Sequence, residues 1–510
     1  MLLLGQANVL YYQHSWGSHR ELLFHDQFLF NPDLTMPAEG KALADAVTLA
    51  KKGIDHLLLR NTVDDSGISM LYSRASEHAC TYWQMYNKDK APATLNPRHQ
   101  QFEFFVPAID ASGRGFSSTG SRLIRAGMLT EKGTKLLILP FAQSIPVKDA
   151  ELIREFVRNG GTVLADFRPA VTDQHGVFGK AGLLDDVFGI KQELDWKFAV
   201  KKTSAVINFP GCDTFKSRSA LVGNGFKVVT ARAMGCAADK TPVMLENKFG
   251  KGRAILLNFT TQEAGFRSFF GQFLTAVGIP ELFGCRTLEN RWFSDRGLVR
   301  EKDIRRDKVV ERDVQDKSET EDAGERETLV YESASFPRRH RIVNGPVEIL
   351  GYYACRRGFS LGYGEMKLEY SVRKPGYVYD LLNGRYLGKT AKWNAVMPLE
   401  AVGLYAVLPF KAAAPVLSQI TVKKNRNSGY NEFSVTVSVN KAAAAVNYPV
   451  YIEFVDPAGK VWNELSGTVS VKNASVRADF ILPVNAPKGK WNIRAREVFG
   501  GETSVKSFTL

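Results

Sequence analysis

Several features by which protein classes are recognised are missing from this chain of 510 residues. No apolar run reaches the roughly 18–20 residues that a membrane-spanning helix needs. No Gly-x-Gly-x-x-Gly follows a strand-like segment, so no dinucleotide site is predicted, and we expect neither a cofactor nor a metal. The five cysteines are far apart and form no Cys-x-x-Cys pair, which favours buried free thiols over a disulfide framework or a zinc site: Cys80, Cys212, Cys236, Cys285 and Cys355.

The net charge of +14 would suit an acidic partner. The basic residues are scattered, however, and no Lys/Arg-rich stripe is interleaved with aromatic residues, so nucleic acid is not expected as a partner. The first ten residues are apolar without a preceding basic segment, and they predict no signal peptide. A cytoplasmic location is slightly favoured on this ground, and no membrane association is expected.

The most informative segment runs from Leu136 to Ile190. It begins with a buried strand and a turn, followed by an amphipathic helix over Val147–Arg158. A Gly160-Gly161 stop ends the helix, and a second buried strand follows. This order predicts a βαβ crossover. Segments 67–73 and 102–108 read as further strands before the one at 135–140, 243–259 as a hairpin, and a Phe-rich segment after it as a helix.

The chain is therefore expected to hold a multidomain arrangement of an α/β part and an all-β part. Residues 62–285 predict a flavodoxin-like domain with a mainly parallel sheet, the architecture of class I glutamine amidotransferases. The regions around it are a first unit at 1–61, a linker with a charged insert at 286–339, a small β domain at 340–412 with a hairpin at Asn383-Gly384, and an immunoglobulin-like sandwich at 413–510.

Two groups of polar residues are candidate sites. Asp166, Arg168, Asp173 and His175 follow a strand, where open α/β sheets bind ligands. A buried pair between Asp166 and Arg168 that holds this loop is nevertheless favoured over a ligand site. The second group is an aromatic and polar cluster near the amino terminus, which includes Trp16, Glu21 and His25 and would suit a sugar pocket at the end of a barrel strand.

The crossover, the Asn247–Phe259 hairpin and the order of units resemble the carboxyl-terminal portion of family 42 glycoside hydrolases, the β-galactosidases with a trimerisation domain. In that family a (β/α)₈ barrel precedes this domain and carries both catalytic glutamates. The resemblance implies that residues 1–61 are a remnant of the last βα unit, that Trp16, Glu21 and His25 contact sugar, and that no residue of this chain is catalytic. It also implies a homotrimer, a galactoside-type carbohydrate as ligand, and a separately encoded barrel as a candidate partner.

Two other classes of function stay open. A small-molecule enzyme of the glutamine amidotransferase-like superfamily would need a reactive cysteine or an exposed serine at a strand-helix turn, and the turns at 139–146 and 165–171 contain neither a cysteine nor a Gly-x-Ser-x-Gly motif. A carbohydrate-binding or cell-surface module would expose aromatic rings on the terminal sandwich. We expect Trp462 and Trp491 in its core instead.

Overall fold

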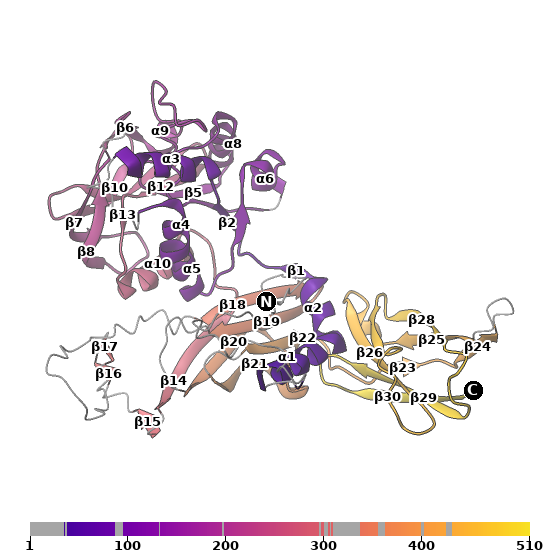
Figure 1. The fold of residues 1–510 in the computed structure, drawn as a ribbon. Coiled ribbons are helices and arrows are strands. Elements are labelled where there is room, and N and C mark those ends of the chain that lie inside the picture. The colour runs from indigo at the N-terminus through magenta and orange to yellow at the C-terminus, as the bar shows by residue number, and fades with distance from the viewer. Residues whose placement is uncertain are drawn as a thin grey trace.

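The computed structural model describes three units that follow one another along the chain (Figure 1). Described are residues 38–86, 95–131, 133–195, 198–294, 337–354, 363–398, 402–424 and 431–510, with shorter stretches at 35, 297–299, 304–305 and 308–309. An α/β unit comes first, then a central antiparallel sheet, then a terminal β-sandwich. Within these residues no helix has the length and apolarity needed to cross a membrane.

A ten-stranded sheet forms the α/β unit. One half of this sheet is parallel and consists of neighbouring strands in the order β3 (Ser117–Thr119), β2 (Ile68–Leu71), β4 (Leu136–Leu139), β5 (Thr162–Asp166) and β12 (Gly252–Leu257). All residues of β2, β4 and β5 are buried, as expected for strands whose two faces are covered. The predicted crossover is confirmed, with α8 at Val147–Arg158 between β4 and β5.

The other half of the sheet corrects the prediction of a mainly parallel domain. It is antiparallel and consists of β11 (Pro242–Phe249), β10 (Arg232–Ala237), β7 (Val200–Ile207), β8 (Phe215–Gly223) and β13 (Phe259–Thr260). The physical reason is the length of the connections, because a few residues can join only antiparallel neighbours. Since β13 continues β12 after Asn258 and pairs with β8, the antiparallel half closes on itself.

The helix α10 (Ala264–Ala276) lies where the sequence predicts it, and a further helix, α3 (Arg74–Tyr86), follows β2. The strand predicted at 102–108 is wrong, because this segment continues from a π-helical turn, η3 (Gln100–Phe105), into α5 (Val106–Ala111). Its rings pack on α10, with Phe104 stacked on Phe266 at 4.6 Å between centroids. A short apolar run does not by itself distinguish a buried helix from a strand.

The central sheet joins strands that are far apart in the sequence. Its order is β1 (Thr62–Val63), β18 (Pro337–Asn344), β19 (Val347–Ala354), β22 (Val402–Leu408), β20 (Tyr363–Asp380), β14 (Gly284–Ser294) and β15 (Gly297–Val299), with β21 (Arg385–Pro398) also paired to β20. The hairpin predicted at Asn383-Gly384 is confirmed, and Gly384 has a φ of +59° there. The segment predicted as a linker from residue 286 instead begins inside strand β14.

Arginines of β18 join the central sheet to the α/β unit. Arg338 pairs with Asp110 at 2.8 Å, and Arg339 pairs with Glu281 at 2.7 Å. Arg341 pairs with Asp64 at 3.0 Å. These acidic partners lie at the amino ends of the parallel strands, so the opposite, carboxyl ends face away from the central sheet. Figure 1 shows α5 and α10 next to β18, with α8 (Val147–Arg158) and α9 (Asp185–Phe188) on the far side.

Two four-stranded antiparallel sheets form the terminal sandwich. One contains β23 (Val416–Leu417), β24 (Thr421–Lys424), β25 (Asn431–Ser438) and β28 (Ser475–Leu482), and the other β26 (Tyr448–Val455), β27 (Gly467–Val471), β29 (Lys490–Glu497) and β30 (Thr503–Thr509). Trp491 is fully buried as predicted, whereas Trp462 is only half-buried and packs against it at 5.3 Å.

The helical segment before β1 packs on this sandwich. It consists of α1 (Ala38–Leu49), a π-helical turn η2 (Ala50–Ile54) and α2 (Asp55–Leu59). Ile54, Leu57 and Leu58 belong to the same apolar core as the sandwich and the central sheet. Thr468 Oγ1 donates to Lys51 O at 2.8 Å, which ties the segment to β27.

Candidate functional site

The carboxyl ends of the parallel strands bring together part of the predicted loop site. Asp166 is the last residue of β5 and is fully buried. One of its carboxyl oxygens, Oδ1, accepts a hydrogen bond from the backbone N–H of Phe141, and Oδ2 is buried without a partner among the described residues. Burial raises the pKa of Asp166 to about 8, and the hydrogen bond from Phe141 opposes this only in part. Asp166 is therefore a neutral acid at pH 7.

Arg168 lies two residues further and is 2% exposed. Its Nη1 donates to Asp195 O at 2.9 Å, and its Nη2 donates to Glu193 O. The expected pair between Asp166 and Arg168 is wrong, because each side chain bonds to backbone groups instead. Burial lowers the pKa of Arg168, and the guanidinium lies over the ring of Phe198 at 5.7 Å.

The backbone at the ends of β4 and β5 is unusual. Four residues that are not glycine have φ in the left-handed region: Phe141 (+42°), Phe167 (+26°), Arg168 (+44°) and Ala170 (+53°). Such conformations are unfavourable for L-residues and persist only where the surroundings hold them. Backbone hydrogen bonds between the two turns do so here, from Ala170 N to Ala142 O at 2.8 Å and from Thr172 N to Gln143 O at 3.1 Å.

The rest of the predicted loop lies at the surface. The Oδ1 of Asp173 accepts hydrogen bonds from the N–H groups of His175 at 2.8 Å and Val177 at 3.0 Å, and His175 is exposed. Asp166 and Arg168 are thus buried, whereas Asp173 and His175 lie in a surface turn. The four side chains do not surround a common cavity. Trp16, Glu21 and His25 lie outside the described residues.

The described nucleophiles near this edge are held in hydrogen bonds or buried. Ser144 Oγ donates to the carbonyl of Asp173. Cys80 lies within α3 and is 2% exposed, and its Sγ is 3.7 Å from Leu95 O. Burial raises the pKa of the Cys80 thiol to about 12. Neither side chain is placed as a nucleophile of the amidotransferase kind.

Cys80 is therefore expected to react with iodoacetamide at pH 8 at least about 100-fold more slowly than Cys236, because so little thiolate forms and the thiol is buried. Cys236 is exposed on β10 and serves as the internal reference. Peptide mass spectrometry after timed labelling measures both rates, and labelling in urea shows that both peptides are detected. Equal rates in the native protein would revive the nucleophile hypothesis.

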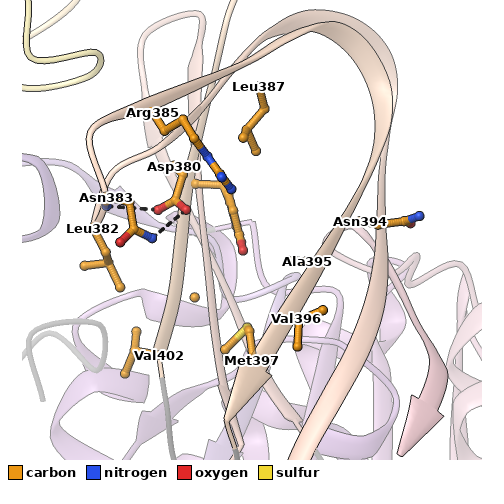
Figure 2. Close-up of a pocket in the computed structure, with 12 residues that line it drawn as sticks. Asp380, Leu382, Asn383, Arg385, Leu387, Asn394, Ala395, Val396, Met397 and Val402 are labelled. Carbon is orange, nitrogen blue, oxygen red and sulfur yellow. Dashed lines mark hydrogen bonds between the residues drawn. The ribbon is translucent and has the colours of Figure 1, made fainter.

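A pocket of about 190 Å³ lies in the central sheet, lined by residues of β20, β21, β22 and the hairpin between them (Figure 2). Asp380 is buried, and its two oxygens accept from Asn383 N at 3.2 Å and Asn383 Nδ2 at 2.8 Å. Burial, followed by the charge of Asp380, raises the pKa of Tyr405 to about 12. Arg385 is the exposed cation of the lining.

This pocket could not be found from the sequence, because the Asn383-Gly384 signal predicts only the turn. Each oxygen of its carboxylate already accepts a hydrogen bond from Asn383, and its tyrosine, Tyr405, is buried rather than presented as a platform for a sugar ring. A second, more open depression of about 490 Å³ is lined by charges of both signs, among them Asp186, Arg232, Glu246 and Lys248. Across the described ranges no three His, Cys, Asp or Glu side chains are grouped to hold a metal ion.

Comparison with known proteins identifies one segment. Residues 130–280 match the family described as the β-galactosidase trimerisation domain. No curated protein matches the sequence. Among solved structures, the chain is similar to Gan42B, a GH42 β-galactosidase from G. stearothermophilus, with 14% identity and a TM-score of 0.50 over 74% of this chain and 45% of that chain. It is also similar to a β-galactosidase from Bacillus circulans sp. alkalophilus, with 14% identity and a TM-score of 0.48 over 72% and 45%.

The chain therefore spans about 45% of the length of these β-galactosidases. At 14% identity the similarity to Gan42B shows a shared fold. The matched domain at 130–280 and this shared fold are what the chain has in common with these proteins.

Proposed function

We propose that this GH42-like chain is the oligomerisation and accessory part of a glycoside hydrolase of the β-galactosidase kind, with a role in carbohydrate metabolism. The observation that carries the proposal is the match of residues 130–280 to a trimerisation domain. The matched segment includes β4, α8, β5 and the whole antiparallel half of the sheet up to β12, followed by α10. The matched segment shares two apolar cores with β2 and the helical segment at 104–109, which precede it in the chain.

Finer statements belong to the same proposal. We propose a homotrimer in which a neighbouring copy helps to form the wall of a galactoside pocket, with a separately encoded barrel supplying the catalytic glutamates. Trp16, Glu21 and His25 would contact sugar in that assembly. The five parallel strands with their crossover support a flavodoxin-like description of 62–285, and the two packed sheets support an immunoglobulin-like description of 413–510.

The mass of the purified chain in solution tests this function. Light scattering coupled to size exclusion is expected to give three times the chain mass of 56.7 kDa at micromolar concentration. A monomer at that concentration would contradict the proposal. A dimer would contradict the homotrimer while leaving self-association in place.

No hydrolysis of an aryl β-galactoside by the purified chain is expected. Glycoside hydrolysis requires two carboxyl groups roughly 5–9.5 Å apart, and the resemblance assigns both of them to a barrel. Turnover measured by release of nitrophenol would argue against an accessory role if it were abolished by Glu21→Gln. The same variant without effect on turnover would point to a contaminating enzyme.

The two alternative classes gain no support. A carbohydrate-binding module would present aromatic rings, but Trp491 is fully buried and Trp462 packs against it. An amidotransferase-like enzyme would need an accessible nucleophile, but Cys80 is buried and the Ser144 hydroxyl donates to the carbonyl of Asp173.

A further inference from the structure

We propose that copies of this chain associate through the carboxyl edge of the parallel strands, at a surface made by Tyr72, Leu123, Val147 and Val177. This inference rests on the proposed function and names the surface through which the copies associate. The four side chains are 46%, 42%, 45% and 59% exposed, although each is apolar or aromatic. Below, these four residues are called the edge surface.

Hydrogen bonds between strand ends bring the first parts of the edge surface together. Tyr72 directly follows β2, and its N–H donates to Thr119 O, at the end of β3, at 2.8 Å. The helix α6 (Ser121–Arg125), which carries Leu123, starts two residues after Thr119. Ser73 Oγ donates to Ser144 O at 2.8 Å, three residues before Val147. The ends of β2, β3 and β4 thus present their residues at one edge.

An ion pair fixes α6 beside α8. Arg125 Nε lies 2.7 Å from Asp149 Oδ1, and Ser121 Oγ donates to the other oxygen of the same carboxylate. Asp149 is buried and lies in the first turn of α8. Leu123 and Val147 are thus exposed residues on two helices whose relative position is set by a buried carboxylate.

The loop after β5 adds the last part of the surface. Ser144 and Thr172 form a parallel bridge, and Thr172 bridges Phe178 in turn. Asp173 N donates to Val177 O at 3.1 Å, which closes the turn that carries Val177 outward. The predicted loop at Asp166–His175 is thus part of this contact surface, with its buried residues as support and its tip exposed.

The opposite edge of the same strands is already covered. Arg338, Arg339 and Arg341 of β18 pair with Asp110, Glu281 and Asp64 at the amino ends. The carboxyl edge lies away from these ion pairs, on the side of α8 and α9 in Figure 1. Exposed apolar residues with charged neighbours such as Arg122 and Glu151 fit the composition of an interface core with a polar rim.

The matched segment identifies the occupant as a second copy. It contains Val147 and Val177, and the family is described as a trimerisation domain. In a closed ring of three, each copy uses two different patches, so the edge surface would contact another face of its neighbour. Loss of these apolar side chains should remove the contact in every copy at once.

The test replaces three of the residues together, as Leu123→Glu, Val147→Glu and Val177→Glu, in the full chain. All three are exposed, and a carboxylate at the first residue of α8 is favourable for the helix. Unchanged circular dichroism and a Tm within about 3 °C of the original would show that the fold is kept. Sedimentation of the variant at about 5–50 μM is expected to show monomer in place of trimer, because a weakened contact dissociates in roughly this concentration range.

A matched control variant shows whether loss of the trimer depends on the edge surface or follows from added charge at any exposed position. Val206→Glu, Val228→Glu and Val229→Glu add the same charge at residues that are 41%, 41% and 64% exposed, on β7 (Val206) and at the end of β9 (Phe226–Val228). The control is expected to stay trimeric. A trimeric edge variant, or a control that dissociates in its place, would overturn the edge surface and leave self-association standing. An unmodified chain that is already monomeric would overturn the proposed function, and the edge surface with it.

Discussion

Replacing Asp166 by asparagine is expected to remove a large part of the pH dependence of folding stability between about pH 4 and pH 8. Asp166 is fully buried, and its pKa is raised from 3.8 to about 8. Asparagine has the shape of the neutral acid, and its carbonyl can accept the same hydrogen bond from Phe141. The variant therefore keeps the native contact without a group that must be neutralised.

The sign follows from proton binding. Below about pH 4 the carboxyl group is protonated in both the folded and the unfolded chain. Folding then carries no cost for neutralising Asp166, and the free energy of unfolding has its full value. As the pH rises, the unfolded chain loses the proton and the folded chain keeps it until about pH 8. The free energy of unfolding then falls by about 1.4 kcal/mol per pH unit, which amounts to several kcal/mol above pH 8.

Urea denaturation of both proteins from pH 4 to pH 9, followed by tryptophan fluorescence, measures this difference. Asp166→Asn should match the original chain near pH 4 and exceed it by several kcal/mol at pH 8. Asp479→Asn is the control, because it makes the same substitution at a carboxylate that is 65% exposed. Parallel curves for the original chain and Asp166→Asn would show that Asp166 is ionised in the folded protein.

Gly252→Ala is expected to destabilise the α/β unit by about 2–4 kcal/mol, which lowers its Tm by roughly 5–10 °C. A Cβ at Gly252 would overlap the carbonyl oxygens of Val157 and Gly161. These belong to the end of α8 and the turn before β5, which lie against the start of β12. Because both are backbone atoms, the helix or a strand must move to make room.

Differential scanning calorimetry of Gly252→Ala tests this expectation. Gly265→Ala is the matched control, because it lies in α10 of the same unit and its Cβ would meet nothing closer than 3.6 Å, in the ring of Phe215. Alanine is the better helix former, so this control should keep or raise the Tm. Equal Tm values for Gly252→Ala and the original chain would mean that the helix end and β12 are not in close contact.

Local sequence patterns predicted those elements whose signals are local. The spacing of apolar residues and the Gly160-Gly161 stop give α8 at Val147–Arg158, and Asn383-Gly384 gives the turn between β20 and β21. Both depend on the period of a helix or the φ requirement of a turn, which neighbouring residues express. The strand predicted at 102–108 is wrong for the same reason. Its run of aromatic residues is compatible with either a strand or a buried helix, and packing against α10 decides between the two.

Local patterns in the sequence are enough to predict the crossover and the all-β tail, and they carry the resemblance to a trimerisation-domain protein. Which surfaces the strand ends contact depends on the three-dimensional packing. It closed the antiparallel half of the sheet through β13 and β8, and it separated Asp166 from Arg168. It also covered the amino edge with β18 and left the carboxyl edge exposed. Pairings such as Phe259 with Val222 and Arg338 with Asp110 join residues that are far apart in the sequence. No local period or turn signal encodes which distant strand will be the neighbour.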